Sequence, residues 1–242
     1  MLHNTFCRRL AALVLTLAVA VSAVLPVFAV YPMPIQTATE TEAVYLFNAD
    51  TGKTLLTQNA DQPRYVASLT KMMTALLLLE SGKDLNGEVT VPTDLTQEFK
   101  DIQNANGTTM GLRIGETVRR IDLLNALLIT SANDAASVIA WDVGGSLNAF
   151  IQQMNARAAE LGCTSATFTC AHGLYDYGNV ASAEDMAKIA AACAANETFA
   201  QVAGSTTYTL GQTNFHSEQR TISSSNPLMD ASGVYYKDSV KW

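Results

Sequence analysis

Residues 65–80 read YVASLTKMMTALLLLE, and this stretch decides how the rest of the chain is interpreted. Its apolar residues fall on nearly every side of a helix, which is typical of a helix buried in the middle of a domain. At its start, Ser68 and Lys71 stand three residues apart, so they share one face of that helix. Burial disfavours the charged form of a lysine amine and lets it act as a base toward a serine hydroxyl. The stretch therefore predicts a serine nucleophile, its base, and a helix N-terminus whose N–H groups can stabilise an oxyanion.

A purely structural interpretation of the same two residues stays open at this point. Residue usage predicts roughly one chance Ser-x-x-Lys match in a chain of this length. A serine that caps a buried helix, with a lysine reaching water one turn later, would give the same pattern. Residues elsewhere in the chain are needed to separate the two interpretations.

The first 29 residues predict a secretion signal. Arg8 and Arg9 precede the almost wholly apolar residues 10–28, and small residues end at Ala29. A membrane anchor is the alternative, since the apolar run is near the lower limit for spanning a bilayer. Pro26 and the small-residue end favour cleavage. We therefore expect a secreted protein in which residues 30–41 form an extended linker and residues 42–242 form one large domain.

The composition of the remaining 213 residues narrows the class of partner. They carry 13 basic and 22 acidic residues, a net charge of −9, without basic clusters. Such a surface argues against nucleic acid or anionic lipid as the main partner. Cys163, Cys170 and Cys193 are an odd number of cysteines, so no disulfide framework is predicted, and one bridge with a third, unpaired thiol is left open. The chain has no Cys-x-x-Cys or His-x-x-x-His spacing, so we expect neither a metal site nor a cofactor.

Hydrophobic periodicity gives the order of the elements. A strand pair is predicted at residues 43–47 and 54–57, and the polar residues 93–111 are typical of a surface loop or short helices. Further elements are predicted as helices at residues 118–130, 134–143, 147–161 and 184–195, and as strands at residues 88–91, 206–210 and 219–222. A strand pair, many helices and then strands again indicate an α/β or α+β domain with a helical insert.

A second polar motif lies between two apolar helices, at Ser131 and Asn133. A hydroxyl and a neutral amide two residues apart in a tight link can point at one place, where the hydroxyl relays protons and the amide holds a peptide group. Ser-x-Asn also occurs at Ser146/Asn148 and at Ser224/Asn226, and each copy could instead be a helix cap or a turn. Only the first copy lies between apolar helices, 63 positions after Ser68.

With these segments in view, the chain resembles the secreted serine-type D-alanyl-D-alanine carboxypeptidases, the low-molecular-weight penicillin-binding proteins of peptidase family S11. The resemblance covers about residues 40–242 and rests on four ordered segments, at residues 63–74, 127–136, 154–162 and 172–186. It implies a β-lactamase/transpeptidase-like α/β (α+β) fold, with an antiparallel sheet flanked by helices and a helical lobe.

The resemblance also implies the roles of the site residues. Ser68 would be the acylated nucleophile and Lys71 its base. Ser131 would relay a proton toward the leaving D-alanine, and Asn133 would hold the substrate's peptide backbone. The substrate would be a bacterial peptidoglycan stem peptide ending in D-Ala-D-Ala, cleaved at the extracytoplasmic face of the cell envelope, and β-lactams would be inhibitors.

The chain departs from the family at the third motif, Lys-Thr-Gly, which the 242 residues do not contain. Lys237 and Lys241 are not followed by Thr-Gly, so neither takes that role. We therefore expect a C-terminally truncated member that lacks the last sheet strands and a membrane anchor, with impaired carboxypeptidase activity.

Two other functions stay open. A class A-like β-lactamase shares the Ser-x-x-Lys and Ser-x-Asn motifs but needs a glutamate for deacylation. No Glu-x-x-Leu-Asn occurs here, which weakens that interpretation. A non-catalytic penicillin- or peptidoglycan-binding fragment is the third hypothesis, because Lys-Thr-Gly is absent. His172 is predicted to be a hydrogen-bonded structural residue rather than a catalytic one.

Overall fold

The computed structural model describes residues 41–174 and 176–229. The predicted secretion signal, nearly all of the predicted linker and the segment around Lys237 and Lys241 lie outside these residues.

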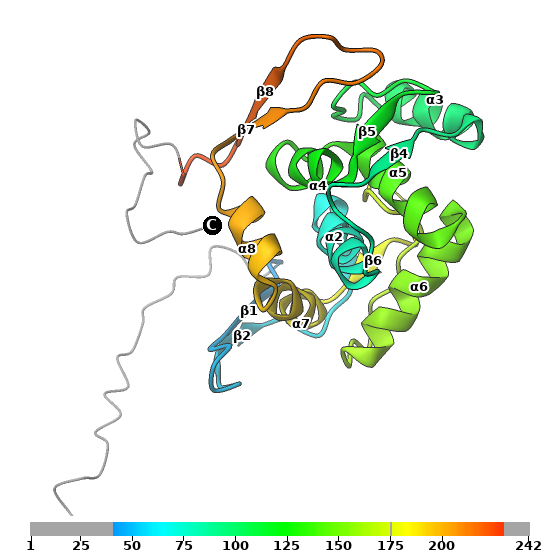
Figure 1. Ribbon diagram of the computed structural model, residues 1–242. Helices are drawn as coiled ribbons and strands as arrows, with labels where there is room; N and C mark the ends of the chain where they lie inside the picture. The colour runs from blue at the N-terminus through cyan, green and yellow to red at the C-terminus, as the bar shows by residue number, and fades with distance from the viewer. Residues whose placement is uncertain (1–40, 175, 230–242) are drawn as a thin grey trace, which may run out of the picture. The chain divides into compact units, whose positions relative to one another are not determined.

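Helix α2 (Thr70–Glu80) lies at the centre of the described fold, directly after a 3₁₀ turn, η1 (Ala67–Leu69). Seven of its residues are buried, so the prediction of a buried helix is confirmed. Five helices contact it, as Figure 1 shows: α4 (Arg120–Ile129), α5 (Asn133–Gly144), α6 (Leu147–Glu160), α7 (Ala183–Ala194) and α8 (Glu197–Ala203). Because each of these helices turns apolar residues toward α2, the N-terminal end of α2 is held rigidly from several sides.

Local signals in the sequence explain where these helices begin and end. Ser146 and Ser182 cap α6 and α7 by accepting the N–H groups of Ala149 and Asp185. Gly145, with φ of 75°, ends α5 in the left-handed conformation that glycine adopts at low cost. A further helix, α3 (Thr96–Asn104), lies in the polar region predicted to be a loop or short helices.

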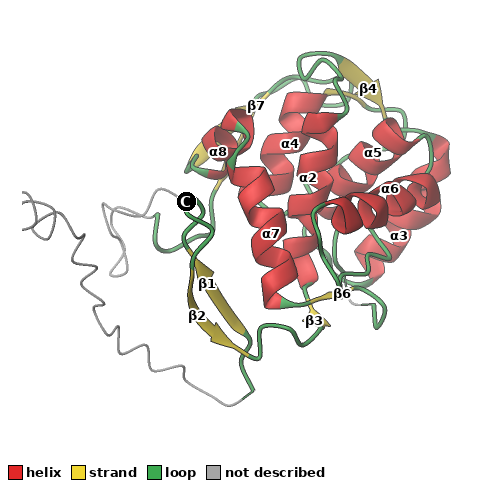
Figure 2. Cartoon of the chain, turned by 90° about the horizontal axis from the view of Figure 1, so that it is seen from below, coloured by secondary structure: helices red, strands yellow, loops and turns green. Residues whose placement is uncertain are grey.

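Within the residues that the structure describes, the strands form four antiparallel pairs, two of which are longer hairpins. Strands β1 (Val44–Phe47) and β2 (Thr54–Gln58) pair as predicted, and β1 contacts α7 (Figure 2). The other pairs are β3 (Arg64–Tyr65) with β6 (Val180–Ala181), β4 (Glu88–Thr90) with β5 (Thr117–Arg119), and β7 (Thr207–Leu210) with β8 (Arg220–Ser223).

The predicted α+β class is confirmed, since helices are mixed with antiparallel strands. The resemblance implied an antiparallel sheet flanked by helices. The strands in residues 41–174 and 176–229 form separate two-stranded sheets instead. Their strands are two to five residues long.

One predicted helix begins later than expected, and one helix was not predicted. A helix was predicted from residue 118, but Val118 lies in β5, where it pairs with Val89, and α4 begins at Arg120. Two buried β-branched residues on facing strands outweigh the helical periodicity there. Helix α8 was not predicted, because the helix before it ends at Ala194 and Asn196 immediately caps a new one.

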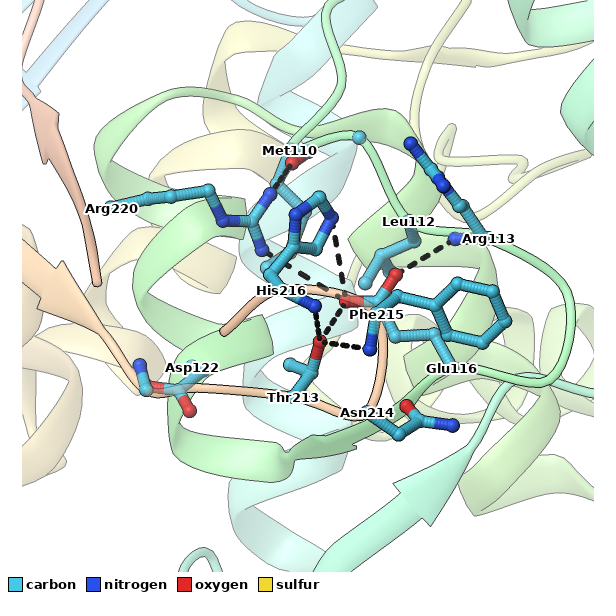
Figure 3. Close-up of polar contacts among 12 residues, drawn as sticks. Met110, Leu112, Arg113, Glu116, Asp122, Thr213, Asn214, Phe215, His216 and Arg220 are labelled. Carbon is cyan, nitrogen blue, oxygen red and sulfur yellow. Dashed lines mark hydrogen bonds and ion pairs between the residues drawn. The ribbon is translucent and has the colours of Figure 1, made fainter. Parts of the chain in front are cut away.

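A buried carboxylate fastens the β7–β8 hairpin to the rest of the fold (Figure 3). The Glu116 side chain is fully buried and accepts hydrogen bonds from the Arg113 N–H at 3.0 Å and the Thr213 hydroxyl at 2.8 Å. The side chains of His216 and Arg220 lie 3.8 and 3.9 Å from the same carboxylate. A buried charge needs such partners, so Glu116 determines where the loop between β7 and β8 packs.

Candidate active site

Ser68 lies in the η1 turn at the start of α2, with its side chain exposed. The preceding residue, Ala67, has φ of 45°, in the left-handed region. Gly173, with φ of 80°, packs its backbone directly against the Ala67 carbonyl, and a β-carbon at position 173 would collide with it. A sharp backbone turn supported by a close glycine contact therefore presents the Ser68 hydroxyl at the surface.

Lys71 is buried one turn further along and points back toward Ser68. Its Nζ lies 3.2 Å from Ser68 Oγ, 2.8 Å from Asn133 Oδ1 and 2.6 Å from the His172 carbonyl oxygen. The three positions around the nitrogen are therefore all occupied by oxygen atoms. The Ser68–Lys71 pair that the sequence predicted is in contact.

The geometry around Nζ suits a neutral amine as well as an ammonium group. A neutral amine has two N–H donors, and the two shorter contacts, to Asn133 and His172, can take both. Its lone pair then faces Ser68, whose hydroxyl can donate to it. Burial lowers the pKa of Lys71 to about 8, although the negative charge of Cys170 acts in the opposite direction. Lys71 can therefore lose its proton near neutral pH without leaving a hydrogen-bond partner unsatisfied.

Ser131 connects α4 to α5 and adopts φ of 59°, also in the left-handed region. Its hydroxyl donates a hydrogen bond to Ser68 Oγ over 3.0 Å. A continuous path for protons thus runs from Ser131 through Ser68 to Lys71.

Asn133 begins α5 and is fixed from two sides. Its Oδ1 accepts from Lys71, and its Nδ2 donates to the Thr108 carbonyl at 2.9 Å. The next residue, Asp134, accepts backbone N–H groups of residues 110–112 at 2.9 to 3.0 Å, which ties that loop to the start of α5. An amide nitrogen has two donors, so the second N–H of Asn133 can serve a substrate carbonyl.

The other two Ser-x-Asn copies have local structural roles. Ser146 is the N-cap of α6. Ser224 accepts the Asn226 N–H at 3.2 Å, and Asn226 accepts the Leu228 N–H at 3.0 Å, as in a turn. The structure thus brings together all four predicted site residues and places neither alternative pair beside them.

The predicted site opens into a surface hollow of about 370 Å³. Ser68, Lys71 and Ser131 supply its polar groups. Its other lining residues are apolar: Val66, Ala67, Leu69, Met72, Leu127 and Leu128. A small apolar side group of an acyl substrate would fit against such walls.

The sequence did not reveal how the segment around His172 takes part. Its backbone carbonyl accepts from Lys71, and its ring nitrogen Nε2 lies 2.9 Å from Glu98 Oε1. Thr74 donates to the Ala171 carbonyl at 2.6 Å, which holds the segment on α2. Every residue type has a backbone carbonyl, so the sequence does not show which carbonyl contacts Lys71. The neighbouring Gly173, which must pack against the turn at Ala67, was the one residue whose type could have indicated this segment.

In the part of the chain that the structure describes, no group of three or more His, Cys, Asp or Glu residues is arranged to bind a metal ion. No helix in residues 41–174 and 176–229 has both the length and the apolar character needed to cross a membrane.

We expect Ser131→Ala and Asn133→Ala each to slow acylation by penicillin by about a hundredfold, because each removes a group that contacts the reacting pair. The acylation rate is measured by labelling with a fluorescent penicillin and quenching the reaction at successive times. Ser146→Ala is the matched control: it should cost about 1 kcal/mol of stability through the lost cap and leave the rate unchanged. A rate loss at Ser146 without unfolding would show that the wrong motif was chosen.

Comparison with known proteins agrees with this geometry. Residues 32–238 match the family model of peptidase S11, D-alanyl-D-alanine carboxypeptidase. The chain is 33% identical over 153 residues to the D-alanyl-D-alanine carboxypeptidase DacF of Bacillus subtilis, covering 63% of this chain and 39% of DacF. It is 32% identical over 175 residues to a D-alanyl-D-alanine endopeptidase of Pseudomonas aeruginosa, covering 72% of this chain and 54% of that protein.

The same relationship holds in three dimensions. The crystal structure of the Streptomyces K15 DD-transpeptidase superposes with a TM-score of 0.71 at 30% identity, covering 78% of this chain and 76% of that one. The chain belongs to the peptidase S11 family of D-alanyl-D-alanine carboxypeptidases. It spans about half or less of the length of the two curated relatives given above.

Proposed function

We propose that this protein is a serine D,D-carboxypeptidase that removes the terminal D-alanine from peptidoglycan stem peptides through an acyl-enzyme on Ser68. The observation that carries the proposal is the contact of Ser68 Oγ with both a buried lysine amine and a second serine hydroxyl. Membership of the family supports the substrate class. Residues 42–242 would form the transpeptidase-like domain, acting outside the cytoplasm after removal of residues 1–29.

In the first step, Ser68 Oγ attacks the carbonyl carbon of the peptide bond between the two D-alanines. The neutral amine of Lys71 takes the hydroxyl proton as the new C–O bond forms. The N–H of Ser68, in the first turn before α2, is the donor we assign to the developing oxyanion.

Breakdown of the tetrahedral intermediate breaks the peptide C–N bond, and the leaving amine needs a proton. Ser131 can deliver its hydroxyl proton to that amine. The ammonium group of Lys71, which holds the proton taken from Ser68, is then the source from which the Ser131 hydroxyl is restored, since both groups lie beside the Ser68 oxygen. Asn133 holds the substrate backbone with its remaining N–H. Water then releases the acyl group by the same steps in reverse order, with Lys71 again as the base.

A β-lactam would enter the same path, because its strained amide carbonyl takes the place of the peptide carbonyl. The amine it releases stays attached to the acyl group, so the adduct is long-lived and can be detected.

One experiment tests the proposal by following two products separately. The chain is incubated with a fluorescent penicillin, and in parallel with a peptide ending in D-Ala-D-Ala. We expect one covalent penicillin per chain, by intact mass, and slow release of free D-alanine. Rapid hydrolysis of the penicillin would indicate a β-lactamase, and labelling without D-alanine release would indicate a binding protein. If the chain forms no penicillin adduct and releases no D-alanine, the proposed function is refuted.

A further inference from the structure

The loop formed by residues 108–112 contacts Asn133 and fixes the orientation of its side-chain amide. The Thr108 carbonyl accepts two hydrogen bonds from Asn133, one from the backbone N–H at 2.8 Å and one from Nδ2 at 2.9 Å. On the other side of the amide, Oδ1 accepts from Lys71 at 2.8 Å. An amide group is planar, so these contacts also set the direction of its second N–H, the donor available to a substrate carbonyl.

The residue before this loop leaves little room around the same amide. A β-carbon at Gly107 would lie 2.9 Å from Asn133 Nδ2. A shift of the loop toward Asn133 would therefore push on the amide, and a shift away from it would break the hydrogen bonds to Thr108. The direction of the Asn133 N–H depends on where the loop is held.

Asp134 holds the loop by its backbone N–H groups. This buried carboxylate accepts from Met110, Gly111 and Leu112 at 2.9 to 3.0 Å, and from the Ala135 N–H at 2.9 Å. Four N–H donors around a buried carboxylate stabilise its negative charge. Because Asp134 follows Asn133 in the first turn of α5, it ties the loop to the same turn that carries the amide.

Arg220, in β8, holds the same loop by a backbone carbonyl (Figure 3). Its Nη1 donates to the Met110 carbonyl at 2.8 Å, although the two residues are 110 positions apart. Its Nη2 lies 3.9 Å from Glu116 Oε1, so a fully buried negative charge holds the guanidinium in place. Met110 is thus fixed at its N–H by Asp134 and at its carbonyl by Arg220.

We propose that Asp134 and Arg220 are positioning residues for Asn133. They hold the 108–112 loop, and the loop holds the amide through the Thr108 carbonyl. The hydrogen bonds and ion pairs of the described residues join neither side chain to Ser68 or Lys71, so both act through Asn133. Their effect on the acylation rate rests on the proposed function, whereas the orientation of the amide does not.

The first test measures acylation of the Arg220→Met chain by a fluorescent penicillin. We expect a rate about tenfold below the native rate, because the amide is displaced but not removed. Arg220→Lys should recover most of that loss, since a lysine keeps the charge beside Glu116 and can donate one hydrogen bond to the Met110 carbonyl. A folded Arg220→Met chain that acylates at the native rate would overturn the proposal.

Tyr208→Phe is the matched control on the same hairpin. The Tyr208 hydroxyl donates to Asp122 at 2.8 Å and so joins β7 to α4 without touching the 108–112 loop. This variant loosens the hairpin to a similar degree and should acylate at the native rate. If Tyr208→Phe slowed acylation as much as Arg220→Met, the effect would belong to the hairpin as a whole, and the proposal would be wrong.

A double-mutant cycle with Asn133→Ala separates positioning from a general loss of structure. If Arg220 acts through the amide, the chain that carries both Arg220→Met and Asn133→Ala should be about as slow as Asn133→Ala alone, roughly a hundredfold below native. Independent losses would instead multiply to about a thousandfold. Multiplication of the two effects would refute the role of Arg220.

Asp134→Asn tests the other attachment of the loop and does not depend on whether Arg220→Met folds. An asparagine keeps the shape of the side chain but replaces one acceptor oxygen with an NH₂ group that faces backbone N–H donors. We expect acylation to slow by about tenfold or more, again without a further loss when Asn133→Ala is added. A folded Asp134→Asn chain with native acylation would remove Asp134 from the proposal.

Nuclear magnetic resonance follows the amide directly, without any reaction. The side-chain NH₂ signals of Asn133 are identified by their loss in Asn133→Ala. We expect them to shift or broaden in Arg220→Met and Asp134→Asn, and to stay in place in Tyr208→Phe. Unmoved signals in both folded variants would overturn the proposal. If the native chain never reacts with penicillin, the proposed function fails, while these signals still decide whether the two residues orient Asn133.

Discussion

Ser68→Ala is expected to abolish covalent labelling by penicillin. The variant removes the attacking oxygen, and no bond can form to the β-lactam carbonyl without it. Removing a nucleophile of this kind typically costs about a millionfold in rate, so labelling should fall below detection. Intact-mass spectrometry of the chain after prolonged incubation is the measurement.

The nearest alternative nucleophile is Ser131, whose hydroxyl lies 3.0 Å from Ser68 Oγ. A penicillin adduct that survives in the Ser68→Ala chain and maps to Ser131 would reverse the assignment of the two serines. Ser224→Ala, in the turn after β8, is the matched control and should label like the native chain.

Lys71→Arg is expected to slow acylation by about a hundred- to ten-thousandfold, the usual contribution of a positioned general base. Arginine keeps the positive charge but does not deprotonate in proteins. The labelling rate with a fluorescent penicillin measures the effect, and thermal unfolding checks that the larger side chain leaves the fold intact. Lys188→Arg, on the surface of α7, is the control.

The pH profile shows whether Lys71 works as a base or only as a charge. The free amine is the active form, and burial lowers the pKa of Lys71 to about 8, so the native acylation rate should rise as the pH rises through about 8. The Lys71→Arg profile should show no such rise. Near-native acylation by the arginine chain would mean that the lysine contributes only electrostatics.

The nucleophile and its base could be found from sequence because their relationship is local. Positions three apart on one helical face meet whatever the rest of the fold does, and the apolar run after Ser68 indicated a buried helix. The link between Ser131 and Ser68 spans 63 positions, and only the surrounding apolar helices and the family resemblance singled it out. The roles of these residues are still predictions.

What the sequence could not show depends on backbone atoms or on distant partners. The His172 carbonyl contacts Lys71 across 101 positions, and any residue type has a carbonyl to offer. The contact between Glu98 and His172 spans 74 positions, so the histidine, taken alone, gave no sign of a neighbouring carboxylate. Its prediction as a hydrogen-bonded structural residue is consistent with that contact.

The left-handed backbone at Ala67 and Ser131 has a thermodynamic consequence. Each such residue that is not glycine costs on the order of 1–2 kcal/mol relative to ordinary backbone conformations. That is a sizeable fraction of a domain's net stability of about 5–15 kcal/mol. The packing of α2 among its neighbouring helices must supply this energy, and both costs fall on residues that aim reactive hydroxyls at each other. At this end of α2, thermal stability and reactivity therefore oppose each other. A change that relaxed the backbone at Ala67 would raise the melting temperature of the chain and would leave the Ser68 hydroxyl less well oriented for attack.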